Sequence, residues 1–223
     1  MSEQGPARGQ RRARRPKTSS GARKREQILD ASVQVFGTGG SAAVTHRAVA
    51  EAAQVPLGST TYYFADRDDL LLQTMAHARE AEAKRLAGIV EALDGPLSVG
   101  QAVDVLTEMF FDKTVADPLY DLALFEMFME ATRQAALRPV TRDWSAMIAA
   151  LVDRVLPASD PALPRDQVVQ IVACLIDGLM LEAVSNAELE VSDLSARLRV
   201  VVARLCTAEP GSRWAAENRG HRS

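Results

Sequence analysis

The residues best equipped for chemistry lie in one segment, from Thr45 to Leu70, which reads THRAVAEAAQVPLGSTTYYFADRDDL. Tyrosine and threonine hydroxyl groups suit phosphate oxygens, and an arginine such as Arg47 can donate two hydrogen bonds to the edge of a guanine. Gly58 and Ser59 lack bulk, so a helix that carries them can approach a groove closely. These residue types indicate a nucleic acid as the partner.

Two short helices joined by a tight turn would hold these side chains in place. Thr45 is a good N-cap for the first helix, and residues 54–56 form the turn. The second helix is expected at about 57–62, and Asp66 caps a long third helix that continues to about Leu93. This arrangement is a helix-turn-helix of the DNA-binding type.

The rest of the sequence also predicts helices. An apolar stripe predicts a first helix at 22–36, which the glycine-rich run 37–40 ends, because glycine readily takes the left-handed cap. No stretch shows the alternation of a strand. The expected fold is all-α with about nine helices, and the later ones are placed near 98–115, 118–135, 139–156, 165–186 and 192–207.

Charge is distributed unevenly along the chain. Residues 1–25 hold nine basic residues and one acidic residue, although the whole chain has a formal net charge of −3. A basic end on an acidic body indicates one surface that meets a polyanion. Residues 1–18 have the composition of a disordered arm, which we expect to meet DNA phosphates; a solvated tail is the alternative. Residues 208–223 are expected to form a flexible tail.

Several other classes of function lack their sequence signals. Cys174 and Cys206 have no metal-ligand spacing and the three histidines form no ligand set, so we expect core thiols, no metal and no cofactor. No catalytic triad, phosphate loop or carboxylate pair indicates an enzyme. No apolar run is expected to reach the length of a membrane span, and the N-terminus lacks a signal core, so a cytoplasmic protein without a membrane partner is expected.

Residues 22–75 resemble the tetracycline-repressor (TetR) family of bacterial transcription regulators. The family pattern is roughly T-x-x-x-I-A-x-x-A-G-V-S-x-G-T-x-Y-x-Y/H-F-x-x-K-x-x-L. The matching residues are Ile28-Leu29-Asp30-Ala31, Phe36, Gly40, Thr45, Val49-Ala50, Ala53, Val55, Gly58-Ser59, Tyr63-Phe64 and residues 66–71. The resemblance implies an N-terminal helix-turn-helix domain at 19–66 and a helical ligand-binding and dimerisation domain at 67–207.

Three residues depart from the family pattern. Gln54 stands where the turn usually has glycine, at a cost of up to ~1 kcal/mol if the backbone is left-handed there. Pro56 replaces a serine that caps the recognition helix and so removes a capping oxygen. Thr61 replaces a tyrosine, and Tyr62 is the residue that would substitute for it.

The resemblance also implies which residues contact DNA. The positions are Thr45, His46, Arg47, Leu57, Gly58, Ser59, Thr61, Tyr62, Tyr63 and Arg67. The alternative for the aromatic run at 62–64 is core packing. Core is favoured for Phe64 and DNA for Tyr62, and Tyr63 is open between the two.

For the body, the resemblance implies a dimer interface on the last two helices and a ligand cavity among the middle ones. Apolar stripes give the dimer candidates Val168, Ile171, Val172, Leu175, Ile176, Leu179, Leu194, Leu198, Val201 and Leu205, with an ordinary core face as the alternative. The ligand candidates are Phe110, Phe125, Glu126, Phe128, Met129, Trp144, Met147 and Met180, and plain core is the default for each. Glu126 would meet a ligand or a bundle edge, with Arg133 as its partner.

Together these observations predict a cytoplasmic homodimeric regulator. It would be a repressor that leaves a pseudo-palindromic double-stranded DNA operator when a small-molecule effector binds. Two other classes stay open, namely a helical enzyme or ligand carrier with a DNA-binding head, and an architectural DNA binder without a ligand. An operator footprint separates specific regulation from general coating of DNA.

Overall fold

The computed structural model describes residues 19–112, 118–186 and 188–207, so the predicted arm at 1–18 and tail at 208–223 lie outside the described residues. Within these ranges the chain is helical and contains no β-strand, and the all-α prediction is confirmed. The elements are α1 (Ser19–Ala43), α2 (His46–Ala52), α3 (Leu57–Tyr63), α4 (Arg67–Glu91), α5 (Val99–Leu106), the π-helical turn η1 (Thr107–Phe111), α7 (Pro118–Arg133), the 3₁₀ turn η2 (Ala135–Leu137), α8 (Arg138–Val155), α9 (Arg165–Ser185) and α10 (Val191–Leu205).

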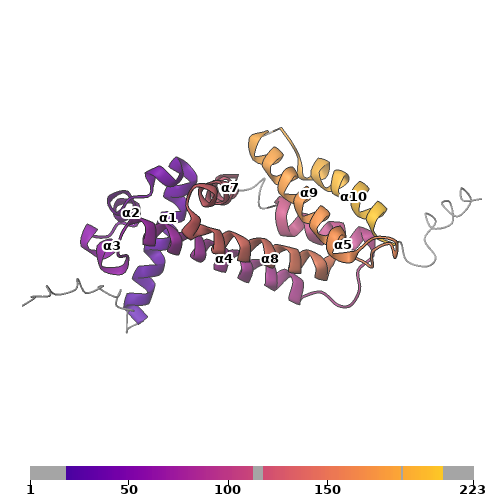
Figure 1. Ribbon diagram of the computed structural model, residues 1–223, viewed down its shortest axis with the longest axis horizontal. Helices are drawn as coiled ribbons and strands as arrows, with labels where there is room; N and C mark the ends of the chain where they lie inside the picture. Colours follow the sequence, from indigo (N-terminus) through magenta and orange to yellow (C-terminus); the bar gives the residue numbers. More distant parts are fainter. Residues whose placement is uncertain (1–18, 113–117, 187, 208–223) are drawn as a thin grey trace, which may run out of the picture.

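Helix α1 is longer than the sequence predicted. Its end was placed at Phe36, but helical structure continues to Ala43. At Gly40 the backbone leaves the helical conformation, with φ 65° and ψ −173°, so the predicted glycine run does interrupt the helix, and a short second helical segment follows the kink to Ala43. The bend turns the last residues of α1 toward α7, which packs against α1 (Figure 1).

Two hydrophobic cores hold the molecule together. The first, which we call the head core, joins α1 and α2 to the first half of α4, and it includes Phe36, Phe64 and Leu71. The second, the body core, joins the end of α4 to α5, η1, α9 and α10. Helices α4 and α8 pack against each other along the molecule and run from one core toward the other (Figure 1).

The head core does not stop at the predicted domain boundary near residue 66. Met127 of α7 and Trp144 of α8 are buried in the same core as Phe36 and Leu71. Residues that were expected to belong to a separate regulatory domain therefore form part of the packing that supports the helix-turn-helix.

Helix α9 is more apolar than the sequence analysis allowed. Among the described residues it is the one helix that is long and apolar enough to cross a membrane by length and composition, so the expectation that no run reaches that length was wrong on this criterion. The core helix of a soluble protein passes the same test, and one face of α9 packs into the body core. The apolar character of its other face is addressed below.

Candidate DNA-binding interface

Local capping sets the start of α2 as the sequence predicted. The hydroxyl oxygen of Thr45 accepts a hydrogen bond from the amide of Ala48 at 3.2 Å. Val49 and Ala50 are buried on the inner side of α2. Asp66 in turn caps α4 by accepting a hydrogen bond from the amide of Asp69 at 2.8 Å.

The turn between α2 and α3 keeps the left-handed backbone that glycine usually supplies. Gln54 has φ 54°, the one positive φ among the described residues other than glycine. Pro56 precedes α3 with φ −57° and ψ 142° and gives no side-chain cap. The structure thus retains the family's turn in spite of both departures, and Gln54 carries the strain.

Thr60 fastens α3 to α2, and the sequence analysis missed it. Its side chain is fully buried. The hydroxyl donates toward the carbonyl oxygens of Leu57 at 2.9 Å and His46 at 3.3 Å. No signal in the sequence singled out Thr60, because its neighbour Thr61 has the same side chain and only packing distinguishes the two.

The predicted DNA contacts form a surface around α3. Thr45, Arg47, Leu57, Gly58, Thr61 and Tyr62 are exposed, whereas His46, Ser59, Tyr63 and Arg67 are partly buried. Tyr62 is 58% exposed, and Arg47 has no hydrogen bond or ion pair with another described residue. A free guanidinium and an exposed phenol are groups that DNA can take without breaking any internal contact.

The aromatic run divides as expected between surface and core. Phe64 is 1% exposed and belongs to the head core, which confirms the core interpretation. Tyr63 packs against that core and meets the ring of Tyr62 edge-on, with centroids 5.0 Å apart. Arg25 is one of the nine basic residues of the segment 1–25. Its guanidinium lies over the Phe64 ring at 5.7 Å and donates a hydrogen bond to Gln73, so it stabilises the fold.

Arg67 is used inside the chain as well. Its Nε donates to the carbonyl oxygen of Val44 at 3.0 Å, and one terminal nitrogen donates to the carbonyl oxygen of Ser41. The guanidinium therefore holds the link between α1 and α2 in position. This structural role accounts for Arg67 without DNA, although its side chain is 38% exposed.

A buried carboxylate of α7 reaches the same link. The hydroxyl of Ser41 donates to Oε2 of Glu130 at 2.7 Å, and Gln134 donates to Oε1 at 2.5 Å. The hydrogen bond from Ser41 is the main cause that lowers the pKa of Glu130, with Gln134 and Arg133 adding to it against the opposing effect of burial. An ionised group of α7 is thus tied to the DNA-binding head.

Glu126 also faces the head. An ideal Cβ on Gly40 would lie 2.5 Å from Oε2 of Glu126, so the carboxylate occupies the space that a side chain at residue 40 would take. The ion pair expected between Glu126 and Arg133 is not the one formed, because Arg133 pairs with Glu130 at 3.4 Å. Glu126 and Glu130 therefore both lie where α7 packs against α1.

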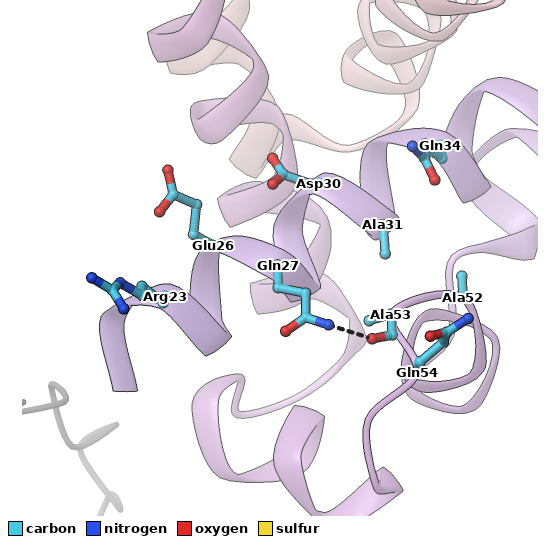
Figure 2. Close-up of a pocket in the computed structure, with 9 residues that line it drawn as sticks. All are labelled: Arg23, Glu26, Gln27, Asp30, Ala31, Gln34, Ala52, Ala53 and Gln54. Carbon is cyan, nitrogen blue, oxygen red and sulfur yellow. Dashed lines mark hydrogen bonds between the residues drawn. The ribbon is translucent and has the colours of Figure 1, made fainter. Parts of the chain in front are cut away.

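A groove of about 370 Å³ lies on the head, between α1 and the end of α2 (Figure 2). Its lining is mixed in charge, with Arg23, Glu26 and Asp30 at its side, and Gln27 crosses it to donate to the carbonyl oxygen of Ala53 at 2.8 Å. None of the predicted ligand residues lines this groove. Its polar walls do not resemble the expected effector site.

The ligand candidates fall into two groups. Phe110, Phe125 and Met180 belong to the body core or pack against it. Phe128, Trp144 and Met147 belong to the head core or pack against it, and the Phe128 and Trp144 rings lie 6.0 Å apart. Met129 is 56% exposed. The eight residues therefore do not surround a single space.

Most dimer candidates are already buried within one chain. Six of them are buried in the body core, namely Val168, Val172, Ile176, Leu179, Leu194 and Leu198. Leu175, Val201 and Leu205 are partly buried. Only Ile171 stands out, at 50% exposed. The stripe chosen from the sequence is therefore mostly the inner face of α9 and α10.

The fold and the exposed α2–α3 surface define a helix-turn-helix DNA-binding protein. Residues 28–74 match the bacterial regulatory proteins of the tetR family, and residues 97–208 match the tetracyclin repressor-like C-terminal domain. The chain belongs to this family and is a ligand-responsive, DNA-binding transcriptional regulator.

Individual relatives agree with this assignment. The transcriptional regulator BetI of Burkholderia thailandensis is 30% identical over 170 residues, covering 74% of this chain and 84% of BetI. The nicotine-responsive repressor HdnoR of Paenarthrobacter nicotinovorans is 24% identical, covering 71% and 82%. The solved multidrug binding protein EbrR, complexed with imidazole, is 31% identical with a TM-score of 0.61, covering 85% of this chain and 98% of EbrR.

Proposed function

We propose that the protein is a homodimeric repressor that acts in the cytoplasm, binds a pseudo-palindromic operator through α2 and α3, and leaves it when a small molecule binds the body. The observation that carries this proposal is the exposed surface around α3, where Arg47 has no hydrogen bond or ion pair with another described residue and Tyr62 is largely exposed. HdnoR, described as a nicotine-responsive repressor, supports repression and release by a small organic effector.

The same relatives guide the proposal for the effector. EbrR has been solved with imidazole, proflavin, ethidium and malachite green. We place the effector against the body core, near Phe110, Phe125 and Met180, because these large side chains gather where α7 and α9 pack together. Phe128 and Trp144 lie in the head core and are assigned to coupling instead.

The route from effector to DNA would run through α7. Glu130 of α7 accepts a hydrogen bond from the hydroxyl of Ser41, at the end of α1. Arg67 donates hydrogen bonds to the carbonyl oxygens of Ser41 and of Val44, the residue directly before the N-cap of α2. A shift of α7 would move the start of α2 and so change the distance between the helix-turn-helix units of the two copies. Coupling needs only such a difference between two states of the body.

The second copy would bind the outer face of α9. Ile171, Cys174, Gly178 and Leu181 lie three or four residues apart, so they share one side of the helix, and all are exposed. The expectation of a core thiol was therefore wrong for Cys174, whereas Cys206 is buried. Nothing lies within 4 Å of an ideal Cβ on Gly178, so another helix can approach closely there. Val200 of α10, 65% exposed, extends the apolar surface.

A footprint on the DNA next to the protein's own gene tests the proposal. A protected, two-fold related site on one stretch, lost for Arg47→Ala but kept for the surface control Met129→Ala, is the expected result. Uniform protection of all DNA would instead support the architectural alternative. Relief of the footprint by a compound that also raises the melting temperature would identify an effector.

A further inference from the structure

Helix α3 lacks the side chains that usually read bases by paired hydrogen bonds. Its seven residues, LGSTTYY, include no arginine, lysine, asparagine or glutamine and no acid. Guanine is commonly read by arginine or lysine and adenine by asparagine or glutamine. If α3 discriminates between bases, it must do so with hydroxyl groups and apolar atoms.

Leu57 is the apolar group that α3 offers. It is 50% exposed and belongs to neither described core, whereas Val55, two residues earlier, packs against the head core. Packing into the two described cores therefore does not account for a leucine at this position. Leu57 is exposed, as are Arg47 and Tyr62 among the other predicted DNA contacts.

Thr61 completes an apolar strip beside Leu57. Residues 57 and 61 are four apart, so they lie one above the other on the helix. The hydroxyl of Thr61 is directed back to the carbonyl oxygen of Gly58, at 3.4 Å, which leaves its methyl group for outside contacts. Among the described residues, none has an atom within 4 Å of an ideal Cβ on Gly58, so the helix surface at that position, next to Leu57, is open.

We propose that Leu57, supported by the methyl group of Thr61, selects thymine in the operator by contact with its 5-methyl group. That methyl is the one apolar group on the base edges of the major groove. The inference deepens the proposed function and depends on the α3 surface being the DNA face. Guanine recognition by the 45–67 segment then falls to Arg47, because Arg67 is held by Ser41 and Val44.

The test begins with selection of binding sites from a random duplex library by the full chain. Each thymine of the selected half-site is then replaced by uracil, which pairs identically and lacks only the methyl group. At one thymine per half-site we expect about a fourfold loss of affinity, equivalent to ~0.8 kcal/mol for one buried methyl group. Replacement in both half-sites should cost roughly fifteenfold.

The decisive variant is Leu57→Ala. It should bind the thymine site about fourfold more weakly per half-site and become insensitive to uracil at that one position, so the two changes are not additive. Because Leu57 is half-exposed, the melting temperature of the Leu57→Ala variant should match that of the wild type. Arg47→Ala is the matched control: it should bind more weakly and keep the wild-type sensitivity to uracil.

Three results overturn the inference, and they can be told apart. If Arg47→Ala weakens binding but Leu57→Ala keeps the wild-type loss at every thymine, the DNA face stands and the thymine contact is refuted. If neither variant changes affinity for the selected site, the proposed DNA face fails and the thymine contact fails with it. Selected half-sites without a recurring thymine would also refute the contact.

Discussion

Replacement of Leu181 by aspartate should dissociate the proposed dimer without unfolding the chain. Leu181 and Ile171 are 52% and 50% exposed in one copy. Full burial of such a side chain contributes about 1.5–3 kcal/mol, so covering the exposed half of both residues in both copies contributes roughly 3–6 kcal/mol. Leu181→Asp removes about half of this amount and leaves two unpaired charges at the interface.

The charges add a desolvation cost of several kcal/mol, so the dimer should weaken by at least about 4 kcal/mol, or roughly a thousandfold in Kd. Light scattering at micromolar protein should then report monomers, and operator binding should fall because a palindrome needs both heads. The control Met129→Asp introduces the same charge at a side chain of similar exposure on α7 and should stay dimeric. An intact Leu181→Asp dimer with an unchanged melting temperature would refute this interface.

Four further predictions follow from the described contacts and the sequence. Arg47→Ala and Tyr62→Ala should each weaken specific operator binding by about 1–3 kcal/mol in gel-shift titrations, while thermal melting stays unchanged. Because the pKa of Glu130 is lowered from its ordinary 4.5, its stabilisation is present above that pH and is lost as pH falls through the folded value. The stability deficit of Glu130→Gln, measured by urea unfolding, should therefore shrink toward acid; a constant deficit would contradict it. Gln54→Gly should stabilise the chain by up to ~1 kcal/mol by relieving the left-handed strain, unless the flexibility of glycine in the unfolded state cancels the gain. Deletion of residues 1–18 should flatten the salt dependence of DNA binding by about five to seven units of log–log slope per dimer, if three or four cations per subunit contact phosphates; an unchanged slope would make the arm a bystander.

The sequence correctly predicted features that depend on residues close together in the chain, such as helix caps and the turn. Thr45 and Asp66 cap helices because a side-chain oxygen and an amide three residues later meet as soon as the helix forms. The left-handed residue at the turn was found from the family pattern and stands at Gln54. The glycine run was rightly interpreted as a helix break, since Gly40 is left-handed, but the helical segment that continues beyond it to Ala43, where α1 packs against α7, was not predicted.

Contacts between distant segments could not be predicted in this way. Ser41 and Glu130 are 89 positions apart, and nothing in either neighbourhood selects the other as a partner. The same holds for Arg67, assigned to DNA from its position in the motif but used to hold the carbonyl oxygen of Val44. Thr60 was overlooked because two adjacent threonines look alike until packing buries one of them.

The sequence by itself determined the helical fold, the helix-turn-helix and the surface that α3 offers, because these depend on periodicity, caps and turns within a few residues. Only the tertiary structure decided which side of α9 is buried in the body core of the same chain. Apolar residues occur on both of its sides, so periodicity alone cannot tell Val172, fully buried, from Ile171, half-exposed. The body core covers one side, and the uncovered side is the surface left for a second copy.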